Sequence, residues 1–191
     1  MANAQQIVLT NVRLSYVHIL KPFANNPGDE PKYSCTVLVP KSDAANLAKI
    51  ESAIKAATEA GKAGRWNGVV PPNVPNPVHD GDGVKTDGTE YGPECKGCLL
   101  FTATAKADRP VDVVDRRMNK IIEPSEIYSG IYANISVNFY PYMYQNKKGV
   151  GAGLGPVQKV KDGESFGGST PTANSVFSAL TDEDDGRPSW L

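Results

Sequence analysis

The segment from residue 131 to residue 144, IYANISVNFYPYMY, alternates apolar side chains with polar-tipped ones. A repeat of two is typical of a β-strand that buries one face. The polar-tipped face contains Tyr132, Asn134, Ser136, Asn138, Tyr140, Tyr142 and Tyr144. Flat phenol rings stack on nucleic-acid bases, while amides and hydroxyls bond to sugars or base edges. The pattern therefore predicts a base-stacking surface; the alternative is a set of good strand formers packed beneath a loop.

A surface that stacks bases also needs cations beside it to neutralise phosphates. Lysines and arginines fall at the ends of the neighbouring predicted strands and in the loops between them. We expect the contacts to the nucleic-acid backbone to include Lys106, Arg109, Arg116, Arg117, Lys120, Lys147, Lys148, Lys159 and Lys161.

Other chemistries fit the sequence poorly. Cys95-Lys-Gly-Cys98 is half of a zinc site, but a second pair is missing and only Cys35, His18 and His79 remain to complete it. We therefore expect free thiols and no metal. The DGDG sequence at 80–83 begins like a calcium loop but lacks the later ligands.

The glycines at 149, 151, 153 and 155 are not followed by the lysine and hydroxyl residue of a phosphate-binding loop. They predict a turn whose backbone approaches something closely, such as a DNA strand. With two histidines and no catalytic constellation, the sequence favours a protein that is not an enzyme and needs no cofactor.

The composition sets the scale of the fold that must position these residues. The chain has 191 residues, 40% of them hydrophobic, with 18 glycines and 15 prolines, which favours one β-rich domain. It contains neither a run of 18 apolar residues nor an N-terminal signal peptide, so we expect no membrane association. Three cysteines, an odd number, fit a reducing cytoplasm better than a disulfide framework.

The pattern of apolar residues predicts several strands and one helix. The helix begins with Ser42 as N-cap, ends at Gly61 and lies outside a sheet. Residues 61–97 form a long irregular insertion, which in a compact domain is usually functional. Residues 145–155 are predicted to be a basic, glycine-rich turn. The strands are expected at 7–18, 32–40, 98–107, 131–144 and 156–160, with a hairpin at 110–124.

Charge is segregated along the chain. Residues 181–191, TDEDDGRPSWL, contain four acids and one arginine, a net charge of −3, so the remaining 180 residues carry 19 basic and 17 acidic side chains, or +2. The composition changes after Lys161, and we expect disorder from about residue 165 onward because little apolar surface is available there. The predicted organisation is a folded domain at 1–164 and a flexible linker with an acidic tail at 165–191.

Several of these segments resemble a family of bacteriophage single-stranded-DNA-binding proteins long catalogued as a domain of unknown function. They are TNVRLSYVH, PKYSCTVLVPK, the DGD at 80–82, and EIYSGIYANISVNFYPY continuing to KGVGAGLGPVQKVKDGE. The resemblance covers roughly residues 7 to 166. It implies a mainly β fold: an oligonucleotide-binding (OB) barrel of five strands in Greek-key order, similar to that of T7-like phages, with one helix, long loop insertions and an unstructured acidic tail.

The resemblance also extends the set of expected DNA contacts. It places Arg13, Tyr16 and Lys32 in matched motifs, beside the residues already named. An aromatic residue of the insertion, Trp66 or Tyr91, is expected to close over the strand. The tail residues expected to dock on replication proteins such as a polymerase or helicase are Asp182, Glu183, Asp184, Asp185 and Trp190.

The sequence thus predicts sequence-nonspecific binding of single-stranded DNA in phage replication or recombination, in the cytoplasm of the infected host. The acidic tail is expected to compete with DNA for the cationic groove and, once displaced, to recruit partners. Tyrosine is also enriched at protein interfaces, so a protein–protein β-barrel module is one alternative. A phage structural protein and an RNA-binding protein are the others.

Overall fold

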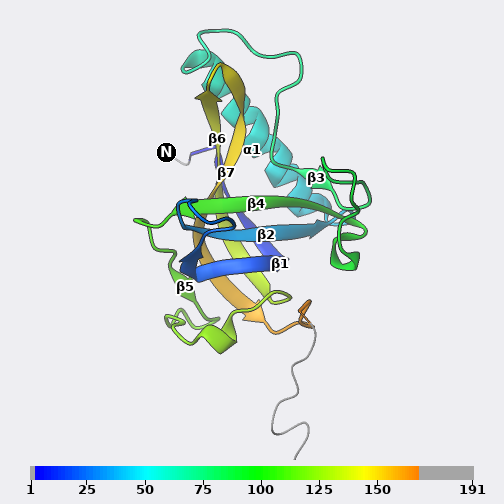
Figure 1. The fold of residues 1–191 in the computed structure, drawn as a ribbon, viewed down its shortest axis with the longest axis vertical. Helices are drawn as coiled ribbons and strands as arrows, with labels where there is room; N and C mark the ends of the chain where they lie inside the picture. The colour runs from blue at the N-terminus through cyan, green and yellow to red at the C-terminus, as the bar shows by residue number, and fades with distance from the viewer. Residues whose placement is uncertain (1–2, 168–191) are drawn as a thin grey trace, which may run out of the picture.

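Five long strands form a closed barrel in the computed structural model, which describes residues 3–167 (Figure 1). β1 pairs with β2 and β6, β2 pairs with β4, β6 pairs with β7, and a parallel bridge between Thr104 and Gly153 joins β4 to β7. This confirms the predicted mainly β, five-stranded OB-like barrel. The barrel strands are β1 (Gln6–Phe23), β2 (Lys32–Pro40), β4 (Cys98–Lys106), β6 (Tyr132–Tyr144) and β7 (Lys147–Lys161).

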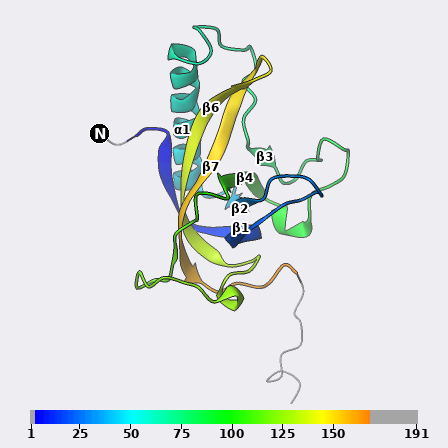
Figure 2. The ribbon, with the colours of Figure 1, turned by 60° about the vertical axis from the view of Figure 1, so that its left-hand side comes forward.

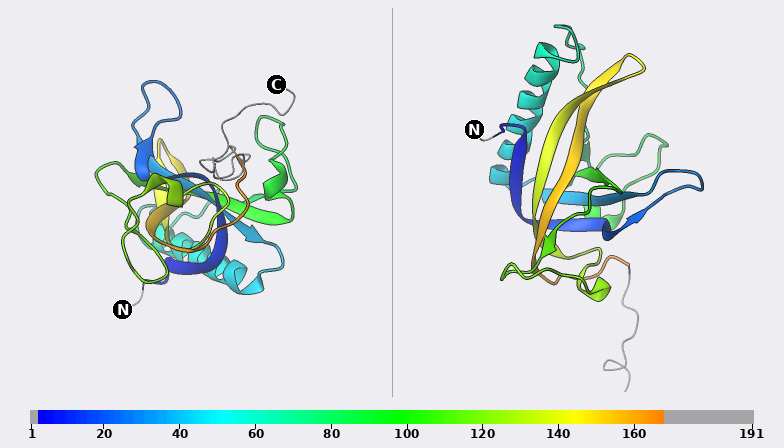
Figure 3. Two further views of the ribbon diagram at one scale, coloured as in Figure 1. Left: turned by 90° about the horizontal axis from the view of Figure 1, so that it is seen from below. Right: turned by 90° about the vertical axis from the view of Figure 1, so that its left-hand side faces the viewer.

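The interior of the barrel, seen end-on in Figure 3, is filled by alternate residues of these strands. Side chains of a strand point to opposite faces in turn, and burying the apolar set removes it from water. The odd positions from Ile131 to Phe139 are fully buried, as the period of two predicts. The rings of Phe101 and Phe139 meet with centroids 5.4 Å apart. The even positions of β6 therefore face outward.

Helix α1 (Ala44–Ala63) packs on the outside of the barrel beside β6 and β7 (Figures 2 and 3). Its N-cap is Asp43, which accepts a hydrogen bond from the Asn46 N–H, and not the predicted Ser42. The helix also continues past Gly61, the predicted end. A Cβ at Gly61 would lie 2.7 Å from ring carbons of Trp66, so this glycine makes room for an indole and does not stop the helix.

β6 and β7 form a long hairpin that rises beyond the rest of the barrel (Figure 1). Its turn is Gln145–Asn146, with φ values of 47° and 63°, as expected for a two-residue type I′ turn. The predicted turn at 145–155 followed by a short strand is therefore wrong, because Lys147–Lys161 is one strand. Its glycines lie across from β6 side chains that occupy the missing volume: Gly149 faces Tyr142 and Gly151 faces Tyr140.

The insertion between α1 and β4 is mostly irregular, as predicted. It contains β3 (His79–Asp80), which pairs with β4, and the 3₁₀ turn η1 (Pro93–Cys95). Lys41 anchors the insertion through two ion pairs, in which its Nζ lies 2.7 Å from carboxylate oxygens of both Asp80 and Asp82. These hydrogen bonds lower the pKa of both carboxyl groups. The segment 80–97 is therefore held in place beside one end of β4.

Residues 107–131 contain a small hairpin and a 3₁₀ turn, η2 (Pro124–Glu126). β5 (Val113–Val114) pairs in parallel with β7, and Val114 forms an antiparallel bridge with Lys120. The hairpin predicted at 110–124 is thus confirmed. The turn itself is held by Asp115, which accepts hydrogen bonds from the backbone N–H groups of Arg117 and Asn119.

The last described residues pack back on the barrel. Arg13 donates to the carbonyl oxygens of Gly130 and Glu164, and its guanidinium carbon lies 4.2 Å from the ring centroid of Phe166. Phe166 also contacts the cluster of Leu38, Cys95 and Leu100. Phe166 thus lies within the described residues and packs on the barrel, whereas the acidic residues of the tail lie outside them. Within 3–167, no helix is long and apolar enough to cross a membrane.

Candidate nucleic-acid interface

Three rows of side chains cross the outer face of β1, β2 and β4, because the strand register brings one residue of each strand into line. The alternate residues of these strands, including Leu14, Val37 and Phe101, are buried in the core, so the rows face outward. The rows are Ser15–Thr36–Thr102, His18–Ser34–Thr104 and Phe23–Lys32–Lys106. The outer face thus carries hydroxyl groups toward one edge, where Thr102 is exposed but Ser15 and Thr36 are buried, and ammonium groups toward the other.

A cleft of about 800 Å³ lies where the cationic edge of this face meets the β6–β7 hairpin. Tyr140, which exposes 40% of its surface, lines the hairpin side together with Asn138. None of the described residues that line the cleft is a carboxylate. Its cations are Lys32, Arg65, Lys106 and Arg109. An open ring beside four positive charges suits a ligand that is both aromatic and anionic.

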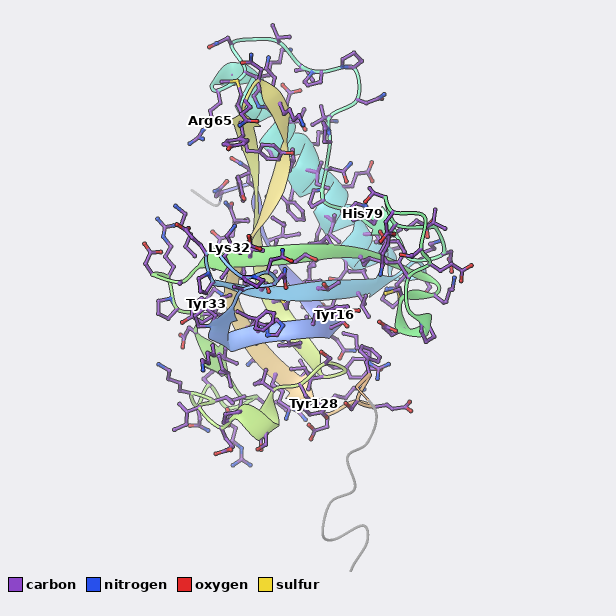
Figure 4. The ribbon with its side chains drawn as sticks, viewed as in Figure 1. Tyr16, Lys32, Tyr33, Arg65, His79 and Tyr128 are labelled. Carbon is purple, nitrogen blue, oxygen red and sulfur yellow. The ribbon has the colours of Figure 1, made fainter. Side chains whose placement is uncertain are left out.

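Sequence reasoning identified three of the four cations of this cleft and its exposed ring, but missed Arg65. It expected Tyr140, Lys32, Lys106 and Arg109 as contacts, and the fold brings these four together from three strands and a loop. Figure 4 places Arg65 near the upper part of the β6–β7 hairpin and Lys32 near one end of β2. Arg65 follows the helix by two residues, in a segment whose path the sequence did not define.

Two further hollows extend the cleft across the barrel face, and we call the whole surface the track. Lys32 and Thr104 line both the cleft and a hollow of about 450 Å³ that also contains Phe23 and two carboxylates, Asp29 and Glu30. Thr102 in turn joins this hollow to one of about 420 Å³. The charged and aromatic residues at that far end are Tyr16, His79, Lys85, Tyr91 and Glu94.

A stacked pair of rings on β1 is a part of the track that sequence reasoning missed. The rings of His18 and Phe23 lie 4.4 Å apart at an angle of 9°, and Phe23 is half-exposed. The strand was expected to end at His18, whereas β1 continues to Phe23 through irregular pairing with β2. Tyr16, which was expected, sits in the same irregular stretch at φ 47° and is largely exposed.

The tyrosines of β6 fall into two groups. Tyr140, the half-buried Tyr142 and the exposed Tyr144 lie on the hairpin, and of these Tyr140 lines the track. Tyr132 lies at the opposite end of the strand, where the Arg13 guanidinium is 5.3 Å and the Lys161 ammonium 4.6 Å from its ring centroid. The predicted continuous stacking face is therefore interrupted, and Tyr132 lies away from the track.

Trp66 is a correction to the expected set of stacking residues. Its side chain is fully buried, packed against Gly61, and its indole N–H donates to the Tyr142 carbonyl oxygen at 2.9 Å. The ring joins the end of α1 to the hairpin and is not accessible to a base. Tyr91 is also partly buried, against the Leu38–Cys95–Leu100 cluster, but it still lines the far end of the track.

The surroundings of the three cysteine thiols favour the neutral thiol over the thiolate. Burial raises the pKa of Cys35, inside the barrel, to about 12, and also raises the pKa values of Cys95 and Cys98. Among residues 3–167, no group of three or more His, Cys, Asp or Glu side chains is placed to hold a metal ion. The cysteines in this part of the chain are free.

The surface just described has counterparts in known proteins. The family model of the single-stranded-DNA-binding protein of Enterobacter phage Enc34 matches residues 5–187. The chain belongs to this family. The matched range includes every residue of the track and the acidic residues 182–185.

Similar proteins come from several phages. The Enc34 single-stranded-DNA-binding protein in complex with single-stranded DNA is 30% identical, with a TM-score of 0.70 over 85% of this chain and 90% of that chain. A protein named p50, of Acyrthosiphon pisum secondary endosymbiont phage 1, is 32% identical over 92% of this chain and 94% of its own length. The single-stranded-DNA-binding protein gp2.5 of bacteriophage T7 shares the fold, with a TM-score of 0.56, 17% identity, and coverage of 91% of this chain and 94% of that chain.

In this member of the Enc34 family, several predicted cations are engaged in internal contacts. Lys159 is buried and paired with Glu126 at 2.9 Å and Asp162 at 2.8 Å. Lys148 donates to two carbonyl oxygens of the segment after α1. Arg13 holds the last described residues, as noted above. These three side chains, which were expected to bind phosphates, are thus already engaged in contacts within the protein.

The remaining predicted cations lie outside the track. A separate hollow of about 570 Å³ beside the small hairpin is lined by basic residues, but also by four carboxylates, so its charge is mixed. Lys147 follows the turn of the β6–β7 hairpin and is exposed there. The basic residues of the separate hollow are Arg116, Arg117, Lys120, Lys159 and Lys161.

Proposed function

We propose that this protein binds single-stranded DNA along the track, without reading base sequence, during phage DNA replication or recombination in the cytoplasm of the infected cell. The cleft carries this proposal, because it combines four cations, no lining carboxylate and the open ring of Tyr140. Membership of the Enc34 family supports it, as does the similarity to a relative whose structure contains single-stranded DNA. Bases stack on Tyr140, Phe23 and Tyr16, while phosphates pair with the cations of the cleft.

The expected salt dependence follows from the number of cations in the cleft. Each phosphate that a lysine or arginine neutralises on a single strand releases condensed counterions, with a log–log slope of about −0.7 per contact. If Lys32, Arg65, Lys106 and Arg109 each pair with one phosphate, the slope of affinity against salt is about −3. Rings and hydroxyls contribute little base preference, because every base offers a π-face.

Fluorescence anisotropy with labelled oligo(dT) at two salt concentrations tests this proposal. Lys106→Glu, in the cleft, is expected to weaken binding about tenfold and to make the salt slope shallower by about 0.7 or more. Lys55→Glu, on the exposed side of α1, is the matched control and is expected to change affinity by less than twofold. Absence of binding by the wild-type protein at low salt refutes the proposal, and matched RNA oligomers test the RNA alternative.

We further propose a two-part organisation in which the segment after the barrel is a linker and regulatory tail. The tail carries a net charge of −3 over residues 181–191, whereas the cleft carries four cations. Opposite charge favours occupation of the cleft by Asp182, Glu183, Asp184 and Asp185 when DNA is absent. DNA then displaces these residues, and Trp190 anchors a replication protein such as a polymerase or helicase.

A further inference from the structure

Two glycines of β7 lie directly beneath two tyrosine rings of β6. A Cβ built at Gly151 would be 2.7 Å from Cζ and 2.8 Å from Oη of Tyr140. A Cβ built at Gly149 would be 2.5 Å from Oη and 2.6 Å from Cζ of Tyr142. Because Cβ atoms do not approach other atoms this closely, each ring occupies space that any larger residue on β7 would fill.

Backbone conformation does not account for these glycines. Neither has φ in the left-handed region, so an alanine fits the backbone at both positions. Glycine inside a strand costs about 0.5–1 kcal/mol relative to alanine, because it loses more conformational freedom on folding. Its use at both positions, directly across from a tyrosine in each case, therefore points to the space that the rings require.

We propose that Gly149 and Gly151 are positioning residues that hold the rings of Tyr142 and Tyr140 against β7 as two successive base-stacking sites. This inference rests on the proposed function. With one face over the glycine, each ring keeps one orientation before DNA arrives, so less side-chain entropy is lost when a base stacks on the other face. Residues two apart on a strand are about 6.8 Å apart, so the two rings serve neighbouring nucleotides.

The structure also indicates that the fold tolerates a methyl group at Gly151. The atoms that it would meet belong to the far end of the Tyr140 side chain, which is free to swing outward because Tyr140 is exposed. Gly155 differs, since a Cβ there would lie 3.0 Å from the backbone oxygen of Ser136, which cannot move alone. Gly151→Ala therefore displaces the ring without disturbing the barrel.

A double-mutant cycle on oligo(dT) affinity tests the inference. Gly151→Ala is expected to weaken binding at least about fivefold, a substantial part of the loss caused by Tyr140→Leu. In the Tyr140→Leu background, Gly151→Ala is expected to change affinity by less than twofold, because no ring remains to be displaced. Additive losses, or no loss from Gly151→Ala in the wild-type background, would overturn the inference.

A control variant and a second pair of variants complete this test. Gly167→Ala adds a methyl group whose nearest contact, the Ser165 Oγ, is 3.9 Å away and outside the track, so binding is expected to be unchanged. Circular dichroism and thermal unfolding check that each variant is folded. If Gly151→Ala is not, the cycle of Gly149→Ala with Tyr142→Leu decides the question. Failure of the wild-type protein to bind oligo(dT) refutes the proposed function, whereas an additive cycle with normal wild-type binding refutes only this inference.

Discussion

Some aromatic residues of this protein are buried and support packing, whereas others are exposed along the track. Trp66 is fully buried and joins the helix to the β6–β7 hairpin. Tyr140, Phe23 and Tyr16 expose between 40% and 62% of their surface along the track. An exposed ring costs solubility and stabilises little, so three of them along one surface that includes the cationic cleft are best explained by a ligand that covers them.

Removal of an exposed ring is predicted to weaken binding without unfolding the protein. Tyr140→Leu and Phe23→Leu each remove one stacking partner, which contributes about 1–3 kcal/mol per base, or roughly fivefold to 150-fold in affinity. Anisotropy titrations with oligo(dT) measure the change, and thermal unfolding checks stability. Tyr132→Leu, away from the track, is the matched comparison, and an equal loss there would argue against the track as the binding surface.

The buried indole is predicted to behave in the opposite way. Trp66→Phe removes the hydrogen bond to the Tyr142 carbonyl oxygen and part of the buried ring, at a cost of about 1–3 kcal/mol in the free energy of unfolding. Urea denaturation measures this loss. DNA affinity under native conditions is expected to change by less than about threefold, and a large loss of affinity with unchanged stability would restore Trp66 as a stacking residue.

Elements whose residues alternate clearly were predictable from the sequence, and β7 shows why others were not. The predicted strand at 32–40 has the bounds of β2, and 131–144 differs from β6 by one residue. In β7 the glycines interrupt the alternation of apolar and polar residues that marks a strand. Tyrosine rings of the neighbouring strand fill the space above two of these glycines, and this contact cannot be read from the β7 sequence alone. Local propensity predicted a turn there, and a cross-strand contact overrode it.

The connection after β7 is predicted to respond to acid. Hydrogen bonds from Lys159 and then Tyr128 lower the pKa of Asp162 below its ordinary value of 3.8. A carboxyl group whose pKa is lowered on folding adds stability above about pH 4 and loses it as pH falls through the folded-state pKa. Asp162→Asn lacks this contribution while its side-chain oxygen still accepts from Tyr128.

Thermal unfolding across pH tests this prediction. The wild-type protein is expected to melt at a higher temperature than Asp162→Asn at pH 7 and pH 5, and the difference is expected to shrink below about pH 4. A difference that stays constant down to pH 2.5 would show that the charge of Asp162 does not contribute.

On the scale of the whole molecule, the binding surface is assembled from parts that lie far apart in the sequence. Residues of the track come from β1, β2, β4, β6 and the segment after α1. Closure of the barrel decides which of these residues lie side by side. The fold class and roughly half of the cleft followed from strand periodicity and the family resemblance. The loss of Trp66, Lys148 and Lys159 from the expected set has one cause, because each is engaged in packing or hydrogen bonds inside the protein.

Deletion of residues 181–191 is predicted to tighten DNA binding. It removes a net charge of −3 that competes for the four cations of the cleft, so the gain is expected to be roughly tenfold at low salt and to vanish at high salt. Anisotropy titrations at both salt concentrations measure it. A full-length variant with amides at 182–185 separates charge from length, and unchanged affinity in both variants would refute the competition while leaving the track intact.

Arg13 and Phe166 fix the point at which the rest of the chain leaves the barrel. Residues 168–191 number 24, and a fully extended chain spans at most about 3.6 Å per residue, so its end lies within about 85 Å of that point. On the proposed role of the tail, a protein bound at Trp190 would therefore lie no farther than this from the barrel. Along DNA covered by this protein, partners bound in the proposed way would be confined to a layer of that thickness.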